Sequence, residues 1–272
     1  MRTTAILASH NRREKTLRCL RSYFDQEVEP GMVLEAVLLD DASSDGTAEA
    51  VRDRFPAVQV LGGTGDLYWA GGMALAERAA LVTNPDFLLW LNDDVVLDQG
   101  ALRRLLDTAG PDAMHIAVGA LRDPVTAEIT YAGFRRRGRH PLRMDLVRPL
   151  EAPVPVDAFH GNVVLVPRPA ALGVGPIDGA LGHDAADLDY GLRARQAGIA
   201  SLLAPDTLGT CARDHPRASW QHRPLKERIR LLLGPKGAPP GARARFLRRH
   251  GGPLWPFFWL VLYVRAVPRL MR

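Results

Sequence analysis

Four groups of polar residues stand at the ends of predicted strands or at the start of a predicted helix. Side chains at the carboxyl ends of strands in an open parallel sheet converge on one ligand site. Adjacent carboxylates are hard oxygen ligands that can hold Mg²⁺ or Mn²⁺ against a diphosphate, and the metal offsets charge on a leaving group. A separate acid can take the proton of an incoming hydroxyl. The four groups are Ser9, Asn11 and Arg12; Asp40 and Asp41; Asn92, Asp93 and Asp94; and His183, Asp187 and Asp189.

Each group also has a plainer structural interpretation. Two aspartates after a strand are common in turns. Asp187 can be a first-turn acid that the helix dipole favours, and Trp69 can be a core aromatic. The order and spacing of all four groups together favour a shared site.

The first hundred residues alternate between strand and helix patterns, which is typical of an α/β protein with an open parallel sheet. Beyond about residue 110 the pattern loosens, and the five prolines of 122–158 predict long loops or hairpins. Residues 234–241 have the composition of a linker. We predict strands at 3–8, 34–39, 58–61, 87–91 and 163–166, and helices at 13–24, 48–55, 71–81 and 187–198.

Composition and missing motifs exclude several classes of protein. The chain has 272 residues, 47% of them hydrophobic, which is ordinary for a globular protein. Its two cysteines cannot form a disulfide framework or a multi-cysteine zinc site. The sequence contains no phosphate-binding P-loop, no dinucleotide fingerprint, no zinc-protease helix and no nucleophile elbow. The N-terminus lacks the pattern of a secretory signal.

The C-terminal region is strongly basic. Residues 220–272 hold 12 Lys or Arg and one acid, Glu227, whereas the rest of the chain holds 23 basic and 29 acidic residues. A spanning helix needs about 20 apolar residues, so the aromatic run 254–264 is too short to cross a membrane. We predict that it lies in the interface of an anionic membrane. The alternatives are an amphipathic helix packed on the domain, or a nucleic-acid-binding tail, for which no motif is present. We therefore expect no nucleic-acid partner.

In their order along the chain, the motifs resemble bacterial glycosyltransferase family 2. VLLDDASSDGTAEAV (37–51) is similar to the family's D-D-x-S-x-D-G-T element, and WLNDDVVL (90–97) to its metal-binding D-x-D element. HDAADLDYGLRARQAG (183–198) resembles the segment with the catalytic base and the R-x-x-x-G signature. Residues 63–76 are similar to a subgroup that includes rhamnosyltransferases. Residues 3–12 and 160–168 resemble the first strand with its nucleotide loop and the acceptor-side strand.

The resemblance implies a GT-A (Rossmann-like) fold, which is an open, mostly parallel sheet flanked by helices, here with a basic C-terminal helical extension. It implies a nucleotide-sugar-binding half at 1–110 and a half for acceptor and catalytic base at 111–220. The extension is then 221–272, with residues 243–272 contacting an anionic membrane surface.

The resemblance also implies roles for single residues. Asp187 would be the catalytic base, although Ala186 replaces the acid that often precedes it, and Asp189 is a lesser candidate. Asp94 would bind the metal, with His215 or His222 as the second ligand. The acceptor side would include His160, Asn162, His183 and Asp189. The nucleotide sugar would contact Ser9, Asn11, Arg12, Asp40, Asp41, Gly65, Trp69, Asn92 and Asp93.

These roles predict an inverting glycosyltransferase that depends on Mg²⁺ or Mn²⁺. TDP-rhamnose is the favoured donor, and the acceptor is a hydroxyl of a lipid-linked cell-surface glycan precursor at the cytoplasmic face of the cell membrane. The alternatives are another UDP- or TDP-sugar, such as UDP-galactofuranose, or a non-catalytic module that only binds a nucleotide sugar.

Overall fold

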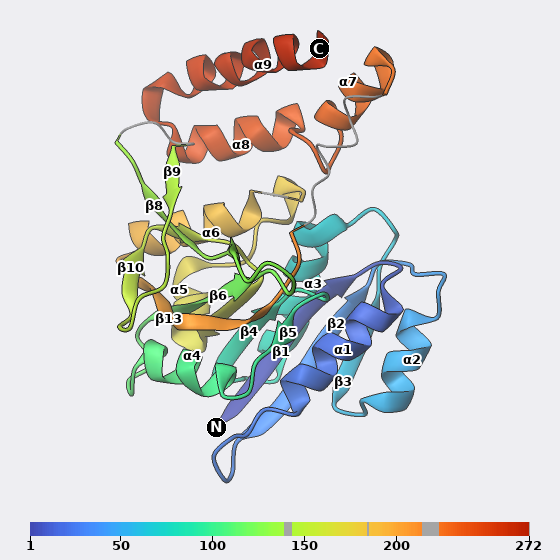
Figure 1. Cartoon of the computed structure of the whole chain (residues 1–272), viewed down its shortest axis with the longest axis vertical. Coiled ribbons are helices and arrows are strands. Elements are labelled where there is room, and N and C mark those ends of the chain that lie inside the picture. Colours follow the sequence, from blue (N-terminus) through green and yellow to red (C-terminus); the bar gives the residue numbers. More distant parts are fainter. Residues whose placement is uncertain (139–142, 184, 214–222, 272) are drawn as a thin grey trace.

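A computed structural model describes residues 1–138, 143–183, 185–213 and 223–271, without the side chains of 268–271. Its main sheet has the strand order β10-β13-β6-β12-β4-β1-β2-β3 (Figure 1). The strands of this path are β1 (Arg2–Ser9), β2 (Val33–Asp40), β3 (Val58–Gly62), β4 (Phe87–Leu91), β6 (Ile116–Arg122), β10 (Val154–Val156), β12 (Val163–Pro167) and β13 (Ser201–Thr210).

Parallel pairing joins β1 to both β2 and β4, β2 to β3, and β6 to β13. The strand β12 runs antiparallel between β4 and β6. The strand order therefore reverses around β1, which has β2 on one side and β4 on the other. Ligands of open α/β sheets bind at such a reversal, outside the carboxyl ends of the strands.

Helices cover both faces of this sheet because successive strand residues point to opposite sides. Ile6 and Trp90 face one core, with α3 (Tyr68–Val82), α5 (Arg168–Val174) and α6 (Ala186–Gln196). Leu7 and Leu91 face the other, with α1 (Arg13–Phe24), α2 (Thr47–Arg54) and α4 (Ala101–Ala109). The result is a three-layer α/β architecture, as predicted.

A small second sheet has the order β11-β8-β9, from β8 (Gly133–Arg136), β9 (Met144–Leu146) and β11 (Ala158–Phe159). Two short strands, β5 (Val96–Leu97) and β7 (Ile129–Tyr131), pair with β13 and β6. The proline-rich region 122–158 thus forms hairpins around short strands, in agreement with the prediction.

The C-terminal region is helical and stacks on the α6 side of the domain (Figure 1). It contains the helices α7 (Leu225–Leu233), α8 (Pro240–His250) and α9 (Trp255–Met271), with the short 3-10 helix η3 (Gly252–Leu254) between α8 and α9. Another 3-10 helix, η1 (Gly179–Leu181), precedes α6. Phe246 and Leu247 of α8 are fully buried in the core that also holds α6. The predicted linker 234–241 is shorter than expected, because α8 begins at Pro240.

One face of α9 packs against this core and another remains exposed. Trp255, Phe258 and Trp259 contact the buried cluster. Phe257, Leu260, Val264 and Val267 are exposed at helical spacing, and we call them the exposed stripe. Among the residues that the structure describes, no helix is long and apolar enough to span a membrane.

Candidate active site

A pocket of 310 Å³ opens where the carboxyl end of β4 meets the start of α6. Predicted residues from both halves of the chain line it. Trp69 and Asn92 come from the first half, and Asp187 from the second. The remaining lining residues are Tyr131, Phe134, His160, Gly161, Asn162, His183 and Leu188.

Asp187 is held in the wall of this pocket by backbone N–H groups. Its Oδ2 accepts a hydrogen bond from Gly161 N at 2.9 Å, and its Oδ1 accepts one from Leu188 N at 2.8 Å. These bonds fix the carboxylate at the first turn of α6, where the helix dipole favours negative charge. An oriented and partly exposed carboxylate is suited to accept a proton.

Trp69 lines the same pocket and is more than a core aromatic. Its indole Nε1 donates to Asn92 Oδ1 at 2.7 Å, which ties α3 to the end of β4. The ring lies so close to Gly161 that a Cβ there would be 2.6 Å from two ring carbons. Glycine at position 161 therefore permits the approach of Trp69 and Asp187 in one pocket.

Arg12 bridges the two carboxylates that follow β4. Its Nη1 lies 3.1 Å from Asp93 Oδ1 and 2.8 Å from Asp94 Oδ2, and Lys15 Nζ lies 3.8 Å from the same Asp94 oxygen. Burial raises the pKa of Asp93, although the charge of Arg12 and a hydrogen bond from Ser9 partly oppose this rise. Two cations thus balance an acidic pair at the edge of the sheet.

The donor set at this edge fits a hard divalent cation that shares its coordination with a substrate. Mg²⁺ in phosphate-binding sites commonly uses only one or two carboxylates plus phosphate oxygens. Asp94 is the more exposed of the pair, with 13% of its side chain accessible against 7% for Asp93. No group of three His, Cys, Asp or Glu side chains converges as a metal site in the described ranges. His215 and His222, the predicted second ligands, lie outside them.

Asp40 and Asp41 after β2 have different environments. Asp41 accepts hydrogen bonds from the backbone of Gly65 at 2.7 Å and of Leu67 at 3.0 Å. Asp41 therefore holds the loop 63–67 and the start of α3. Asp40 Oδ2 accepts from Ser43 N at 3.2 Å, whereas its buried Oδ1 has no hydrogen-bond partner. A buried acceptor without a donor is costly, so Asp40 Oδ1 suits a ligand N–H or O–H group.

The loop after β1 is built around Asn11, which has a left-handed backbone with φ 52°. Its backbone N–H donates to Ser43 Oγ at 2.8 Å, and its Oδ1 accepts from Ser44 N at 2.8 Å. Ser9 is buried, with its Oγ 2.9 Å from the hydroxyl of Thr16. Asn11 thus joins the loop after β1 to the loop after β2, Ser9 joins the end of β1 to α1, and both act in this structure as supports of the site.

The predicted acceptor-side residues His160, Asn162 and His183 all line the pocket. Burial lowers the pKa of His160 to about 4 and the charge of Arg213 adds to this effect, whereas a hydrogen bond to the backbone carbonyl of Ala132 opposes it. His160 is therefore neutral near pH 7. The backbone carbonyl of Asn162 accepts from Asn92 N at 2.9 Å, which joins the start of β12 to the end of β4.

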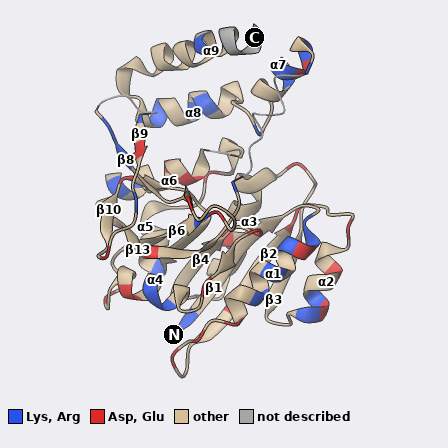
Figure 2. Ribbon diagram, viewed as in Figure 1, with Lys and Arg blue, Asp and Glu red and all other residues tan. Residues whose placement is uncertain are grey.

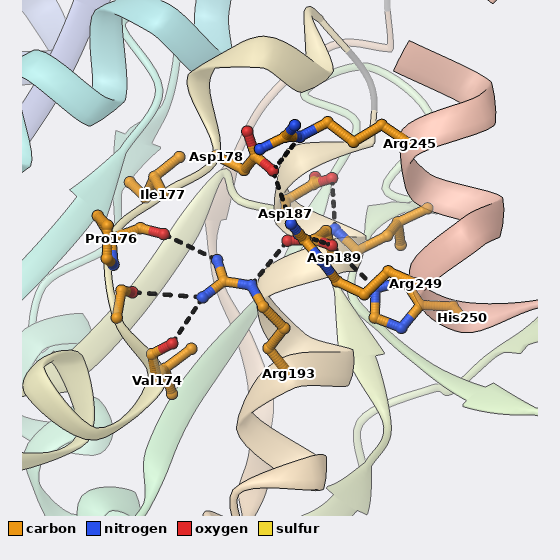
Figure 3. Close-up of polar contacts among 12 residues, drawn as sticks. Val174, Pro176, Ile177, Asp178, Asp187, Asp189, Arg193, Arg245, Arg249 and His250 are labelled. Carbon is orange, nitrogen blue, oxygen red and sulfur yellow. Dashed lines mark hydrogen bonds and ion pairs between the residues drawn. The ribbon is translucent and has the colours of Figure 1, made fainter. Parts of the chain in front are cut away.

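Asp189 does not reach the pocket, which corrects its predicted place on the acceptor side and as a second base. Its side chain is fully buried on the other side of α6 (Figure 3). The carboxylate contacts Arg193 at 2.8 Å, His250 Nε2 at 2.9 Å and, more closely, Arg249. Burial opposes ionisation, but the hydrogen bonds from His250, Arg193 and Arg249 outweigh it and lower the pKa of Asp189 to about 2.

Several site residues were not predicted from the sequence. Lys15 stands three positions after Arg12, which is one helical turn, and this spacing was a usable signal. The Cys211 thiol lies 3.4 Å from Asp94 Oδ1, and Tyr131 and Phe134 line the pocket. Tyr131 and Phe134 belong to β7 and β8, and Cys211 directly follows β13, all in the region where the sequence pattern is loose.

Comparison with known proteins identifies the family. The family described as "Glycosyl transferase family 2" matches residues 4–161. No curated protein matches the sequence as a relative.

Three solved structures share the fold at low identity. The mannosyltransferase PcManGT from Pyrobaculum calidifontis, in complex with GDP-Man and Mn²⁺, has a TM-score of 0.57 and 17% identity, over 98% of this chain and 75% of that one. GalNAc-T7 with UDP, GalNAc and Mn²⁺ has a TM-score of 0.63 and 14% identity, and the match covers 97% of this chain and 57% of that one. TarS 1–349 from S. aureus has a TM-score of 0.58 and 13% identity, and the match covers 93% of this chain and 73% of that one.

Proposed function

The chain belongs to glycosyl transferase family 2, and from this premise we propose that it transfers a sugar from a nucleotide-diphosphate donor to an acceptor hydroxyl, with inversion at the anomeric carbon. The observation that carries the proposal is the pocket shared by Asp187 and the end of β4. Asn92 lines this pocket two residues before Asp94, and Asp187 is oriented in it by Gly161 N. The proton acceptor therefore shares its pocket with Asn92, the residue that directly precedes the candidate metal ligands Asp93 and Asp94.

The donor nucleotide occupies the carboxyl ends of β1 and β2. Asp40 Oδ1, buried and without a partner, accepts a hydrogen bond from the base or ribose. Asp41 acts indirectly, because its oxygens already hold the loop that contains Gly65. We favour TDP-rhamnose, since residues 63–76 resemble a rhamnosyltransferase subgroup, over another UDP- or TDP-sugar such as UDP-galactofuranose.

Asp94, with Asp93 beside it, would hold Mg²⁺ or Mn²⁺, and the bound ion would stabilise the negative charge of the departing diphosphate. Mn²⁺ is present in the structures of PcManGT and GalNAc-T7. Arg12 and Lys15 balance the charge of Asp94 when no ion is bound.

Asp187 acts as general base in one displacement. Its carboxylate takes the proton of the acceptor hydroxyl while the acceptor oxygen forms a bond to the anomeric carbon. The bond from that carbon to the diphosphate oxygen breaks, and the nucleoside diphosphate leaves with the electron pair. Attack opposite the leaving group inverts the anomeric centre. General-base catalysis of this kind contributes about 10²–10⁴-fold.

The acceptor is a lipid-linked precursor of a cell-surface glycan, and the enzyme binds peripherally to the cytoplasmic face of an anionic membrane. In support, α8 and α9 contain no acidic residue, and Figure 2 marks positions of Lys and Arg in blue along their ribbons. The exposed stripe supplies apolar contact area, and each basic residue near an anionic surface adds about 1 kcal/mol. Flotation with anionic vesicles tests this. Phe257→Asp with Leu260→Asp should abolish binding without opening the core, and unchanged flotation would refute it.

The function itself is tested by release of nucleoside diphosphate from a panel of donor sugars, with Mn²⁺ and a lipid extract as the source of acceptor. One donor should give a glycosylated lipid of inverted anomeric configuration. Binding of a donor without any product from any acceptor extract would favour the alternative, a non-catalytic nucleotide-sugar-binding module.

A further inference from the structure

A second cavity, larger than the pocket of the candidate active site, lies outside that site. It has a volume of 940 Å³ and lies between β8, the second half of α6, and the turn between α8 and α9. We call it the arginine cavity, because Arg135, Arg136 and Arg195 line it. Its other lining residues are Gly138, Asp157, Leu192, Gln196, His250, Gly251, Gly252, Pro253, Leu254 and Phe258.

The arginine cavity carries an excess of positive charge. Asp157 is its one acidic lining residue, and it already pairs with Arg195 at 3.0 Å. Arg135 donates to the backbone carbonyl of Pro155, and Arg136 to that of His250, both at 3.1 Å. Neither of these two guanidinium groups has a carboxylate partner among the described residues. Two cations thus face the cavity without an anion.

Arg136 has one donor that nothing satisfies. Its Nε is buried and has no hydrogen-bond partner. Since buried donors are nearly always paired in folded proteins, an unpaired one indicates an absent acceptor. A phosphate group matches a guanidinium group well, because two of its oxygens can accept two parallel N–H bonds.

The mouth of the cavity is apolar on one side. Leu254, which is 62% exposed, and Phe258 line it beside Pro253. Pro253 and Leu254 belong to η3, which directly precedes α9, and Phe258 lies in the first turn of α9, next to the exposed stripe in sequence. A ligand that fills the cavity therefore meets arginines at one end and an apolar surface at the other.

The arginine cavity and the candidate active site share two elements. On β8, Phe134 lines the active-site pocket, and the next two residues line the arginine cavity. On α6, Leu188 lines the pocket and Arg195 the cavity, which separates them by about 10 Å along the helix axis at about 1.5 Å per residue. A sugar joined to a phosphate group spans a distance of this order.

We propose that the arginine cavity binds the phosphate or diphosphate group of an amphiphilic ligand whose apolar chain leaves over Leu254 and Phe258. The identity of this ligand as the acceptor rests on the proposed function. Binding of the phosphate and the chain does not, because it depends only on the cavity.

Farnesyl phosphate, below its critical micelle concentration, is a suitable probe, with inorganic phosphate and farnesol as its two separate parts. Arg135→Gln with Arg136→Gln should weaken its binding about tenfold or more. Arg137→Gln is the matched control, because Arg137 is on the same hairpin, pairs with Asp145 and does not line the cavity. Phe258→Ser should weaken farnesyl phosphate but leave inorganic phosphate unchanged.

Equal affinity of the double variant and Arg137→Gln for farnesyl phosphate would overturn the proposal. So would farnesol binding as tightly as its phosphate, which would show an apolar site only. If the double variant fails to fold, a photoreactive farnesyl phosphate should label 133–138 or 251–258 in the native protein, and labelling elsewhere is the contrary result. Nucleotide binding, measured on the same samples, keeps a failure here separate from a failure of the proposed function.

Discussion

Asp189 and His250, 61 residues apart in the sequence, meet through a contact of 2.9 Å between a fully buried carboxylate oxygen and the imidazole Nε2. Asp189 is on α6, two residues after Asp187, and His250 ends α8. Arg249 completes the contact and also binds Asp178 at 3.0 Å, as Figure 3 shows. The C-terminal region therefore holds α6, the helix that carries the candidate base, through Asp189 rather than through the pocket residues.

Asp189→Asn should strongly destabilise the protein, because it leaves the partly buried cations Arg193 and Arg249 beside a fully buried neutral group. Removing one partner of a buried ion pair costs about 3–5 kcal/mol. Urea unfolding of both proteins at pH 7 gives the difference. Asp145→Asn is the control, since its carboxylate pairs with Arg137 on the surface. Equal stability of the two variants would show that the buried contact contributes little.

Asp187→Asn should lower the transfer rate about 10²–10⁴-fold, which is the usual contribution of a general base. The amide oxygen can still accept from Gly161 N, so donor affinity and melting temperature should stay near those of the native protein. Asp107→Asn, at an exposed position on α4, controls for loss of one charge. Turnover within a few-fold of native would remove Asp187 from the mechanism.

Gly161→Ala should reduce activity while the protein stays folded. A Cβ at this position lies 2.6 Å from Trp69 ring carbons and 3.2 Å from Asp187 Cβ, so the pocket wall must move. Tryptophan fluorescence should report the displaced indole. Gly241→Ala is the matched control, because a Cβ there meets nothing within 4 Å. Native rates and fluorescence in Gly161→Ala would contradict this packing.

Glu77 should make stability fall as pH rises towards neutrality. Burial raises its pKa from 4.5 to about 7, against a hydrogen bond from Ile177 N and the charge of Arg193. Between pH 4.5 and about 7 the folded protein holds a proton that the unfolded chain has released. The stability that this proton contributes is therefore fully present below pH 4.5 and is lost as the pH rises to about 7. Since one pKa unit corresponds to about 1.4 kcal/mol, the free energy of unfolding should fall by about 3 kcal/mol over this range.

Glu77→Gln has no such proton to lose. Urea unfolding at pH 5, 6, 7 and 8 should therefore give a smaller decline for the variant than for the native protein. Parallel pH profiles would mean that Glu77 titrates normally in the folded state.

The sequence was most informative where structure depends on local pattern. The helix 13–24 and the strand 87–91 are confirmed at their predicted ends, because apolar spacing and flanking polar residues define them. The helix predicted at 71–81 begins earlier, at Tyr68, since the carboxylate of Asp41 binds the backbone N–H groups of Leu67 and Tyr68.

Contacts between distant segments could not be predicted in this way. Neither β6 nor β13 was assigned from the sequence, although both are central to the sheet beyond β12. Asp189 was misplaced for the same reason. Its sequence neighbourhood is that of a catalytic motif, whereas its partner His250 comes from a helix whose packing no local pattern reveals.

The most direct test of the proposed function is titration of the protein with UDP-, TDP-, GDP- and CMP-sugars, with and without Mn²⁺. One nucleotide class should bind, at least about tenfold more tightly with Mn²⁺. Asp94→Ala should lose the metal dependence, and Asp187→Asn should keep it. Failure of every nucleotide to bind, or an Asp94→Ala protein that binds with native affinity and native metal dependence, would contradict the account.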